Sequence, residues 1–415
     1  MTTTAPSGSS GVGVEPRADA RVDSGRAWAV AVMGMLANAV TFGILYGFGT
    51  FFDEMAAEFG AGRGATAAVF SINTFVFFSL GLFTGPLSDR IGPRRIIVAG
   101  AVCLAAGLYL TSRVQHLWLG YLTFGGGVGV GVGCFLVPVV AAVGRWFVRR
   151  RSLATGITLT GMGLGTLVVV PLIEALVDRV GWRDAFAALA AVALVTLLAL
   201  ALVVGQPPAP AGARPAVSVR ELAADGRFRR LYGCETFLSA ALFVPFVFLV
   251  SYAEDHGVAG GPASLLIGVI GASSIVGRLG LASLTGRLGA VRLLLLCFVL
   301  QPAGYLAWLA SDGAYPVLVV FAVLLGVGYG GFISIAPEVA TQIWGATSLG
   351  SVIGLLYTGG GVGGLIGPIS AGLLIDAAGG SYTVPILAAA ALTAVSLGFL
   401  WPLRSYDDLA RQARG

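Results

Sequence analysis

Long apolar runs alternate with short polar segments along nearly the whole chain. Twelve runs reach the roughly 20 mainly apolar residues that a membrane-spanning helix requires. They lack the period-two alternation of barrel strands, and an open sheet cannot satisfy its backbone in hydrocarbon. The pattern therefore predicts an all-α integral membrane protein. The expected spans are residues 28–52, 65–86, 96–113, 117–143, 152–177, 184–204, 229–252, 263–285, 291–311, 314–339, 347–374 and 382–402.

Polar segments flank and divide these runs. Residues 1–26 are rich in Ser, Thr, Gly and Pro, a composition typical of a disordered tail, and they contain no signal-peptide pattern. A Pro-rich stretch in the middle of the chain predicts a linker with one short amphipathic helix. The expected organisation is a cytoplasmic N-tail (1–26), a six-helix bundle (27–204), a cytoplasmic linker (205–228), a second six-helix bundle (229–404) and a cytoplasmic C-tail (405–415).

Composition and charge place the chain in a membrane and orient it. Hydrophobic residues make up 57% and charged residues 11%, which excludes an ordinary soluble domain. The basic residues are all arginines. With a cytoplasmic N-terminus, twenty lie on the cytoplasmic side, four outside and Arg278 within a span, so both termini are expected inside a bacterial inner (plasma) membrane. The basic cluster at 145–151 is then a lipid-headgroup anchor, and no nucleic acid is expected.

An internal repeat divides the chain into two similar halves. Eight residues recur in order at an offset of 199 or 198 positions, which predicts six spans repeated in parallel. Two such bundles are the architecture of a secondary transporter with its site near the midplane. The glycines among them permit either static close packing or sliding of helices. The pairs are Gly127, Gly129, Gly131, Pro138, Trp146, Gly156, Gly161 and Gly165 with Gly326, Gly328, Gly330, Pro337, Trp344, Gly354, Gly359 and Gly363.

Residues that would support catalysis or metal binding are scarce. The four cysteines all lie in apolar runs without CxxC spacing and are interpreted as small buried hydrophobes. His116 and His256 lie at span ends, and no HExxH motif or paired-carboxylate spacing occurs. No enzyme activity, metal or cofactor is expected.

The loop after the second span carries a family resemblance. "GPLSDRIGPRR" (85–95) resembles the G-x-x-x-D-R-x-G-R-R motif of the major facilitator superfamily. The resemblance covers the chain from 27 to 404 and implies a twelve-helix transporter whose loop forms a charged cytoplasmic gate. The matching residues are Gly85, Asp89, Arg90, Gly92, Arg94 and Arg95.

A second segment resembles the monocarboxylate-transporter-like branch, which includes bacterial oxalate/formate antiporter-like members. "WFVRRRSLATGITLTG" (146–161) is similar to the motif that opens the fifth span there, and "VDSGRAWAV" (22–30) is a weak echo of the branch's opening motif. The matching residues of the first segment are Trp146, Phe147, Arg149, Arg150, Arg151, Leu153, Ala154, Gly156 and Gly161.

Arg278 is the one charged residue near the middle of an apolar run without a neighbouring acid. A charge at the centre of a membrane helix costs roughly 2.5–3.5 kcal/mol, so a compensating interaction is expected. One candidate is a structural interaction of the guanidinium with backbone carbonyls or with a remote acid. The other is a forked contact with a substrate anion. The resemblance supports the second, since an arginine of the eighth span holds the substrate carboxylate in that family.

Two family positions differ here. An acid associated with proton coupling is replaced by Ser274, and a lysine of the first span by Tyr46 in an ungapped comparison. These differences weaken the case for proton symport. Glu338 is the candidate for proton coupling, Glu235 is a second acid that could titrate, and both could instead be helix-end acids paired with loop arginines.

Four further residues are candidates for the substrate site, with interface packing as the alternative for each. Tyrosine suits a carboxylate because it offers one hydroxyl donor on an apolar ring. The candidates are Asn38, Tyr121, Tyr329 and Tyr357, with Asn73 weaker.

The expected function is secondary transport of a small organic anion, a monocarboxylate such as lactate, pyruvate or acetate. Alternating access would be driven by proton symport or by exchange for a counter-anion. The alternative is efflux of a drug or a larger organic anion. A monomer in the lipid bilayer is expected, with protons or a counter-anion as the other partners.

Overall fold

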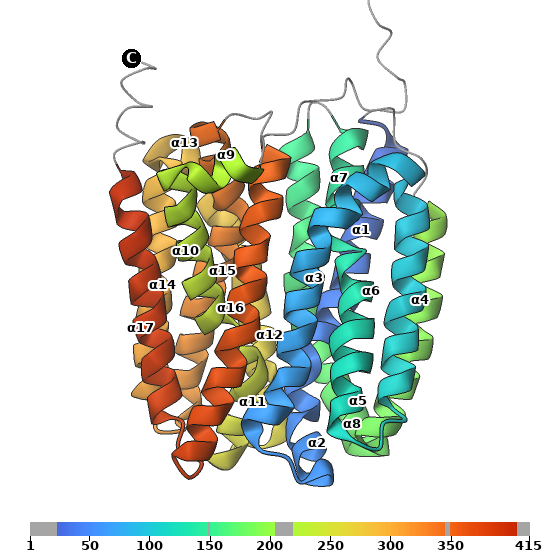
Figure 1. Ribbon diagram of the computed structural model, residues 1–415, viewed down its shortest axis with the longest axis vertical. Helices are drawn as coiled ribbons and strands as arrows, with labels where there is room; N and C mark the ends of the chain where they lie inside the picture. The colour runs from blue at the N-terminus through green and yellow to red at the C-terminus, as the bar shows by residue number, and fades with distance from the viewer. Residues whose placement is uncertain (1–22, 148–149, 204–218, 345–348, 405–415) are drawn as a thin grey trace, which may run out of the picture.

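Helices make up the described secondary structure, which contains no strand (Figure 1). The structure is a computed structural model that describes residues 23–147, 150–203, 219–344 and 349–404. The all-α prediction is confirmed. The first half consists of α1 (Gly25–Tyr46), η1 (Gly47–Phe51), α2 (Phe52–Phe59), α3 (Arg63–Ile91), α4 (Pro93–Thr111), α5 (Leu117–Gly120), the π-helix η2 (Tyr121–Val128), α6 (Gly129–Gly133), α7 (Leu136–Trp146) and α8 (Arg151–Val203).

The second half follows the same course. Its elements are α9 (Val219–Ala224), α10 (Gly226–Leu242), α11 (Val244–Asp255), α12 (Gly260–Val276), the π-helix η3 (Gly277–Leu281), α13 (Thr285–Leu288), α14 (Ala290–Leu309), α15 (Tyr315–Trp344), α16 (Leu349–Ala377), α17 (Thr383–Leu400) and η4 (Trp401–Arg404).

Eleven helical stretches of the described chain are long and apolar enough to cross a membrane. One of them, α8, has 53 residues. At ~1.5 Å per residue it would extend ~80 Å, more than twice the ~30 Å hydrocarbon core. Gly181, with φ +75°, breaks it. The fifth and sixth predicted spans therefore both lie in α8.

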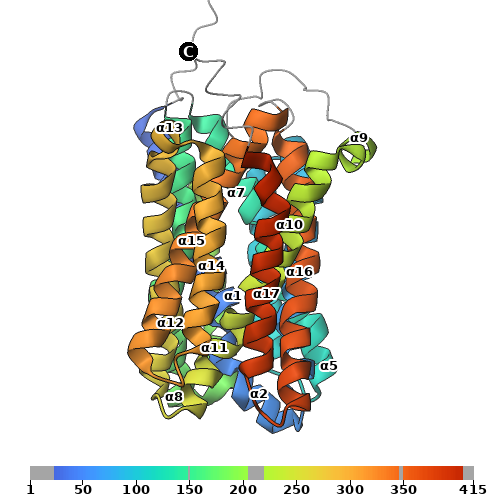
Figure 2. The same ribbon diagram turned by 90° about the vertical axis from the view of Figure 1, so that its left-hand side faces the viewer.

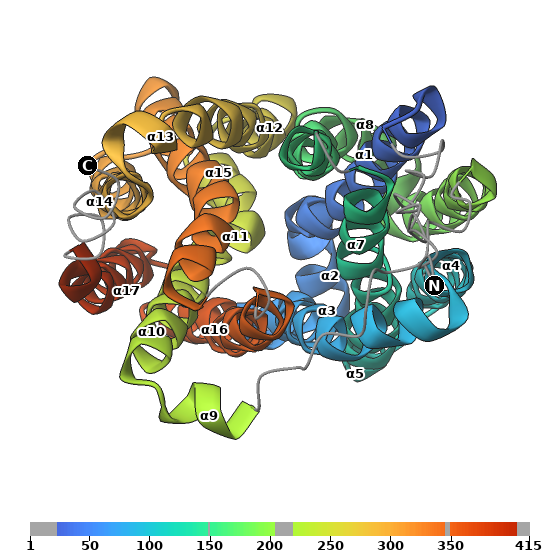
Figure 3. The same ribbon diagram turned by 90° about the horizontal axis from the view of Figure 1, so that it is seen from above.

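The two halves stand side by side (Figure 3). Helix α8 of the first half contacts α12 of the second, and α3 contacts α16. Gly25 of α1 and Leu400 of α17 lie at one end of the bundles, here called the terminal face (Figures 1 and 2). The other end, where α2 ends at Phe59 and α11 at Asp255, is called the opposite face.

Equivalent glycines serve equivalent purposes in the two halves. Gly92, between α3 and α4, has φ +89° and ψ 144°, and Gly289, before α14, has φ +94° and ψ 140°. Both values lie in a region that side chains other than glycine rarely adopt. The residues are 197 positions apart, and each ends a similar short segment, "DRIG" at 89–92 and "GRLG" at 286–289. The same sharp turn thus connects the same pair of spans in each half.

The repeated glycines also allow close helix packing. In α8, a Cβ atom at Gly161 or Gly165 would overlap the backbone of α1. In α16, a Cβ at Gly363 would overlap the backbone of α10 in the same way. Small residues at these positions allow the two backbones to approach.

Buried apolar residues form three clusters that differ between the two faces. The largest contains residues of both halves, including Phe52 of α2 and Phe248 of α11, whose rings lie 5.1 Å apart. Near the terminal face there are two separate clusters, one around Trp146 in the first half and one around Phe228 in the second. The halves therefore share a core toward the opposite face and have separate cores toward the terminal face.

Candidate functional site

Arg278 lies in the π-helix η3, which interrupts the eighth span. A π-helical turn is wider than an α-helical one and occurs frequently at functional sites. The preceding residue, Gly277, lies so close to the carbonyl of Val327 in α15 that a Cβ would overlap it. This close packing holds the arginine backbone against α15.

The guanidinium of Arg278 reaches across to the other half. The residue is 1% exposed. Its Nη1 donates to the backbone carbonyl of Leu159 in α8, and its Nη2 lies 3.6 Å from the sulfur of Met162. Its Nε has no hydrogen-bond partner among the described atoms. A buried cation is thus satisfied only partly, by uncharged acceptors, where the halves meet.

Three tyrosines surround this guanidinium. The Cζ of Arg278 lies 5.5 Å from the ring centroid of Tyr329 in α15. The hydroxyl of Tyr329 shares a 3.0 Å hydrogen bond with that of Tyr46 in α1, which joins the halves. Tyr357 of α16 lies within electrostatic range of Arg278. We call Arg278, Tyr46, Tyr329 and Tyr357 the central cluster.

Aromatic rings line the central cluster. Tyr46 stacks on Phe246 of α11 with ring centroids 4.3 Å apart, and Phe246 lies 6.3 Å from Tyr329. The ring of Tyr357 lies 5.5 Å from that of Phe78 in α3. Polar groups in an apolar surround suit a small ligand with one charged group and a short hydrophobic body.

The structure does not bring every predicted site residue to this cluster. The amide nitrogen of Asn38 donates to Thr158 (3.0 Å), and that of Asn73 donates to Phe124 (2.8 Å). Both bonds tie together helices of the first half. Tyr121 donates its hydroxyl to Ala65 near the opposite face (3.0 Å).

The two acidic candidates have different surroundings. Glu338, on the terminal side of Pro337 in α15, is exposed, so the structure does not bring it to the central cluster. Glu235 of α10 is buried, with 7% of its surface exposed. Ser274, at the position of the family acid, donates its hydroxyl to the carbonyl of Gly271 in its own helix (2.8 Å).

The predicted gating motif lies on the terminal face, between α3 and α4. Arg90, Arg94 and Arg95 are exposed there, and Gly85 packs against Val137 of α7. The side chain of Asp89 lies outside the described part of the structure.

The two segments that resemble the monocarboxylate branch contact one another. Asp23 donates its backbone N–H to the carbonyl of Trp146 (3.0 Å), and Trp28 packs edge-on against Phe147 (4.9 Å between centroids). Arg149 lies outside the described residues, as does the side chain of Arg151. Further along, Ala154 is buried whereas Arg150 and Leu153 are exposed.

The second half begins in a similar way. Asp225 caps α10 by accepting from the backbone N–H of Arg227 (2.8 Å) and also accepts from Trp344 at the end of α15 (2.9 Å). The hydrogen bonds from Arg227 lower the pKa of Asp225 to about 2. The carboxylate is therefore ionised at neutral pH.

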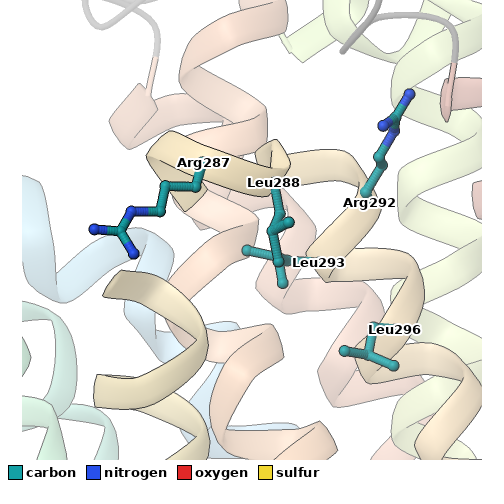
Figure 4. A pocket seen from close by; sticks show the side chains of 5 residues that line it. All are labelled: Arg287, Leu288, Arg292, Leu293 and Leu296. Carbon is teal, nitrogen blue, oxygen red and sulfur yellow. The ribbon is translucent and has the colours of Figure 1, made fainter. Parts of the chain in front are cut away.

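A cavity of about 240 Å³ lies away from the central cluster, between α13 and α14. Figure 4 shows leucines along its wall and two arginines at its rim. Exposed arginine next to exposed leucine is typical of a membrane boundary. The lining residues are Arg287, Leu288, Arg292, Leu293 and Leu296.

Sequence reasoning missed a network that joins the halves at the opposite face. Arg63 donates Nη1 to the hydroxyl of Tyr382 (2.6 Å) and Nη2 to Asp255 (2.9 Å). Asp376 accepts from the backbone N–H groups of Arg63 (2.9 Å) and Gly64 (3.0 Å). We call Arg63, Asp255, Asp376 and Tyr382 the opposite-face latch. Its only signal in the sequence was Arg63, one of four arginines on the side poor in arginine.

Charge and burial act together in the opposite-face latch. Tyr382 donates to Asp255 (2.7 Å) and lies under the guanidinium of Arg63. Burial, helped by the hydrogen bond to Asp255, raises the pKa of Tyr382, so this hydroxyl remains a donor. The side chain of Arg63 is 23% exposed, so water screens the contacts in part.

Two repeated helical halves that pack side by side, with a candidate site between them, are the architecture of two-bundle membrane transporters. The sequence profile of the Major Facilitator Superfamily matches residues 34–282 and 231–415. The chain belongs to this superfamily and is a multi-pass membrane transporter.

Known relatives place it near the monocarboxylate transporters. Monocarboxylate transporter 13 of Rattus norvegicus is 30% identical over 382 residues, 91% of this chain and 89% of that protein. Monocarboxylate transporter 3 of the same organism is 32% identical over 381 residues (88% and 78%). The MFS-type transporter pynF of Aspergillus niger is 30% identical over 367 residues (86% and 83%). The resemblance to the monocarboxylate branch is confirmed.

Solved structures share the fold. A bacterial homolog of the human lysosomal transporter Spinster, in an inward-facing and unoccupied conformation, superposes with a TM-score of 0.67 at 16% identity, covering 94% of this chain and 98% of that one. The predicted major facilitator fold is confirmed.

Proposed function

We propose that the protein transports a small monocarboxylate across the plasma membrane by alternating access. The observation that carries this proposal is the buried guanidinium of Arg278, which has only uncharged acceptors and an unpaired Nε. A carboxylate offers two acceptor atoms that match the guanidinium fork. The hydroxyls of Tyr329 and Tyr357 provide further donors beside it.

The position of the central cluster supports alternating access. Arg278 and Tyr329 belong to the second half, and each contacts the first half, at Leu159 and Tyr46 respectively. A ligand held there would contact both halves, and rocking of one half against the other would expose it to either side.

The arginine distribution supports a cytoplasmic terminal face. A cysteine introduced at the exposed Ala378, on the opposite face, would then react with a membrane-impermeant thiol reagent in whole cells. A cysteine at the exposed Ala223, on the terminal face, would react only after lysis. The reverse pattern would contradict this orientation.

Arg278→Gln tests the anion contact. We expect uptake of radiolabelled lactate, pyruvate or acetate into proteoliposomes to fall by ~10-fold or more, since a hydrogen bond to a charged group contributes ~1.5–3 kcal/mol. Arg278→Lys should restore part of the activity, because lysine keeps the charge but not the fork.

The matched control is Arg230→Gln, which removes an exposed arginine of the same half outside the central cluster. It should leave uptake unchanged. Full uptake by a normally inserted Arg278→Gln protein would show that Arg278 does not hold the anion.

Export of a larger organic anion is the second candidate. The MFS-type transporter pynF, whose name specifies no monocarboxylate, has the same identity to this chain as monocarboxylate transporter 13, which favours considering a substrate of another kind. A thermal-shift screen separates the two, because a ligand that binds the folded protein raises its melting temperature. Stabilisation by bulky aromatic carboxylates without stabilisation by lactate, pyruvate or acetate would favour export.

A further inference from the structure

Glu235 is a buried carboxyl group near the central cluster. It lies on α10, and its Oε1 accepts a 3.3 Å hydrogen bond from Ser239 one turn later. A Cβ at Gly360 of α16 would lie 3.0 Å from this oxygen, so the glycine leaves room for the carboxyl group. Glu235 forms no ion pair with a described residue.

The groups around Glu235 are almost all uncharged. Its own helix contributes the thiol of Cys234 and the hydroxyl of Ser239, and α16 and α15 contribute Tyr357 and Tyr329. Helix α3 contributes the apolar ring of Phe78, which also lies close to Gly360. An ionised carboxylate in such surroundings is unfavourable unless a positive charge or a proton compensates it.

The positive charge that the central cluster provides is Arg278. Tyr329 and Tyr357 each interact electrostatically with both Glu235 and Arg278. The two charged residues therefore share neighbours without forming a direct ion pair.

We propose that Glu235 is a proton-binding residue whose protonation is coupled to the binding of an anion at Arg278. The proposal rests on the proposed monocarboxylate transport and adds its coupling ion. It assigns the coupling carboxyl to the seventh span, because the eighth-span position has Ser274 and Glu338 is exposed.

The coupling follows from the charge balance of a low-dielectric site. Without a ligand, ionised Glu235 and Arg278 sum to zero. An anion on Arg278 leaves an excess negative charge, which a proton on Glu235 removes. Anion and proton therefore favour each other's binding by the same factor. The site has no net charge when it holds both the anion and the proton, or when it holds neither. A carrier that favours these two states moves the anion and the proton together, which is symport.

Glu235→Gln tests the proposal because it keeps the shape and removes the titratable group. We measure uptake of radiolabelled lactate, pyruvate or acetate into proteoliposomes with an inward proton gradient and at equal pH on both sides. In the wild type, the gradient should increase uptake several-fold. In Glu235→Gln the ratio of the two rates should fall to about one, and Glu235→Asp should restore part of it.

Two controls locate the effect. Glu338→Gln removes an exposed carboxyl of the same half and should keep the wild-type ratio. Glu174→Gln removes the other buried carboxyl group of the described residues, which lies near Glu254. This variant should also keep the wild-type ratio of uptake with and without the gradient. Loss of the ratio in Glu174→Gln with a normal ratio in Glu235→Gln would overturn the proposal and assign coupling to α8.

The outcomes for the two proposals are distinct. If the wild type transports an anion through Arg278 and Glu235→Gln responds to the gradient as the wild type does, the proton site is wrong and the transport function stands. If the wild type transports none of the three anions in either condition, both proposals are overturned. A Glu235→Gln protein that lacks all uptake is checked by Glu235→Asp, where a ratio of about one would also overturn the proton site.

Discussion

At the scale of single residues, the hydroxyl of Tyr329 is a hydrogen-bond donor of the central cluster on the ring that the guanidinium of Arg278 faces. Tyr329→Phe removes one hydroxyl but keeps the ring that lies 5.5 Å from Arg278. If this hydroxyl donates to the bound carboxylate, its loss should weaken anion affinity ~10-fold or more, as expected for a hydrogen bond to a charged group. Isothermal titration with lactate, pyruvate or acetate measures the change.

Tyr305→Phe is the matched control for that substitution. Tyr305 is also fully buried in the second half, but its hydroxyl donates to the carbonyl of Ala241 (2.7 Å), outside the central cluster. This variant should lower the melting temperature and leave anion affinity unchanged. Equal loss of affinity in both variants would indicate a general effect on packing instead of a direct contact.

The sequence predicted part of the central cluster for a physical reason. Arg278 stood out because a charge in an apolar run requires compensation, and Tyr329 and Tyr357 were named as polar residues of apolar spans. For Tyr46 the sequence shows only that it replaces a lysine of the family. Its hydrogen bond to Tyr329, 283 positions away in the chain, depends on how the halves meet, which a local pattern does not contain.

Tyr121 shows the limit of the same reasoning. It lies only one turn after the start of its span at Leu117, and it opens the π-helix η2. Depth in the membrane could have been counted from the sequence, and it argues against a midplane position. The direction of the side chain cannot be predicted from the sequence, because a π-helical turn changes the angle between successive residues.

At the scale of elements, hydropathy located the spans because the hydrocarbon core sets their length. It did not locate helix ends. The first span was expected at 28–52, whereas the helical stretch continues through Asp53 and Glu54 to Phe59, since polar residues also form helix outside hydrocarbon. Likewise, α8 continues past the expected boundary until Gly181 breaks it.

The repeat was visible at this scale because it rests on glycines that the packing requires. Gly161 and Gly165 face α1, and Gly363 faces α10, at distances where a side chain would overlap backbone. The sequence could not decide between static packing and sliding. The structure adds that these contacts lie within a half, so they hold each bundle together as a unit that can move as a rigid body.

For the whole molecule, the opposite-face latch holds the halves together at one end. Opening that face must separate Arg63 of the first half from Asp255, Asp376 and Tyr382 of the second. The side chains of Arg63 and Asp255 are 23% and 46% exposed, so each contact is weak enough to break during a transport cycle. Such a contact shifts the balance between two conformations without fixing either.

Arg63→Gln should shift that balance toward the conformation open at the opposite face. Loss of the partly exposed ion pair with Asp255 and of the hydrogen bond to Tyr382 removes ~1 kcal/mol, which is a factor of ~5 in the ratio of the two conformations. We expect a cysteine in place of Ser251, which is fully buried near the end of α11 at this face, to react correspondingly faster with a membrane-impermeant thiol reagent. Arg183→Gln is the matched control, because Arg183 pairs with Glu58 (2.6 Å) at the same face within one half. Equal acceleration in both variants would show that lost surface charge, and not separation of the halves, changes the labelling rate.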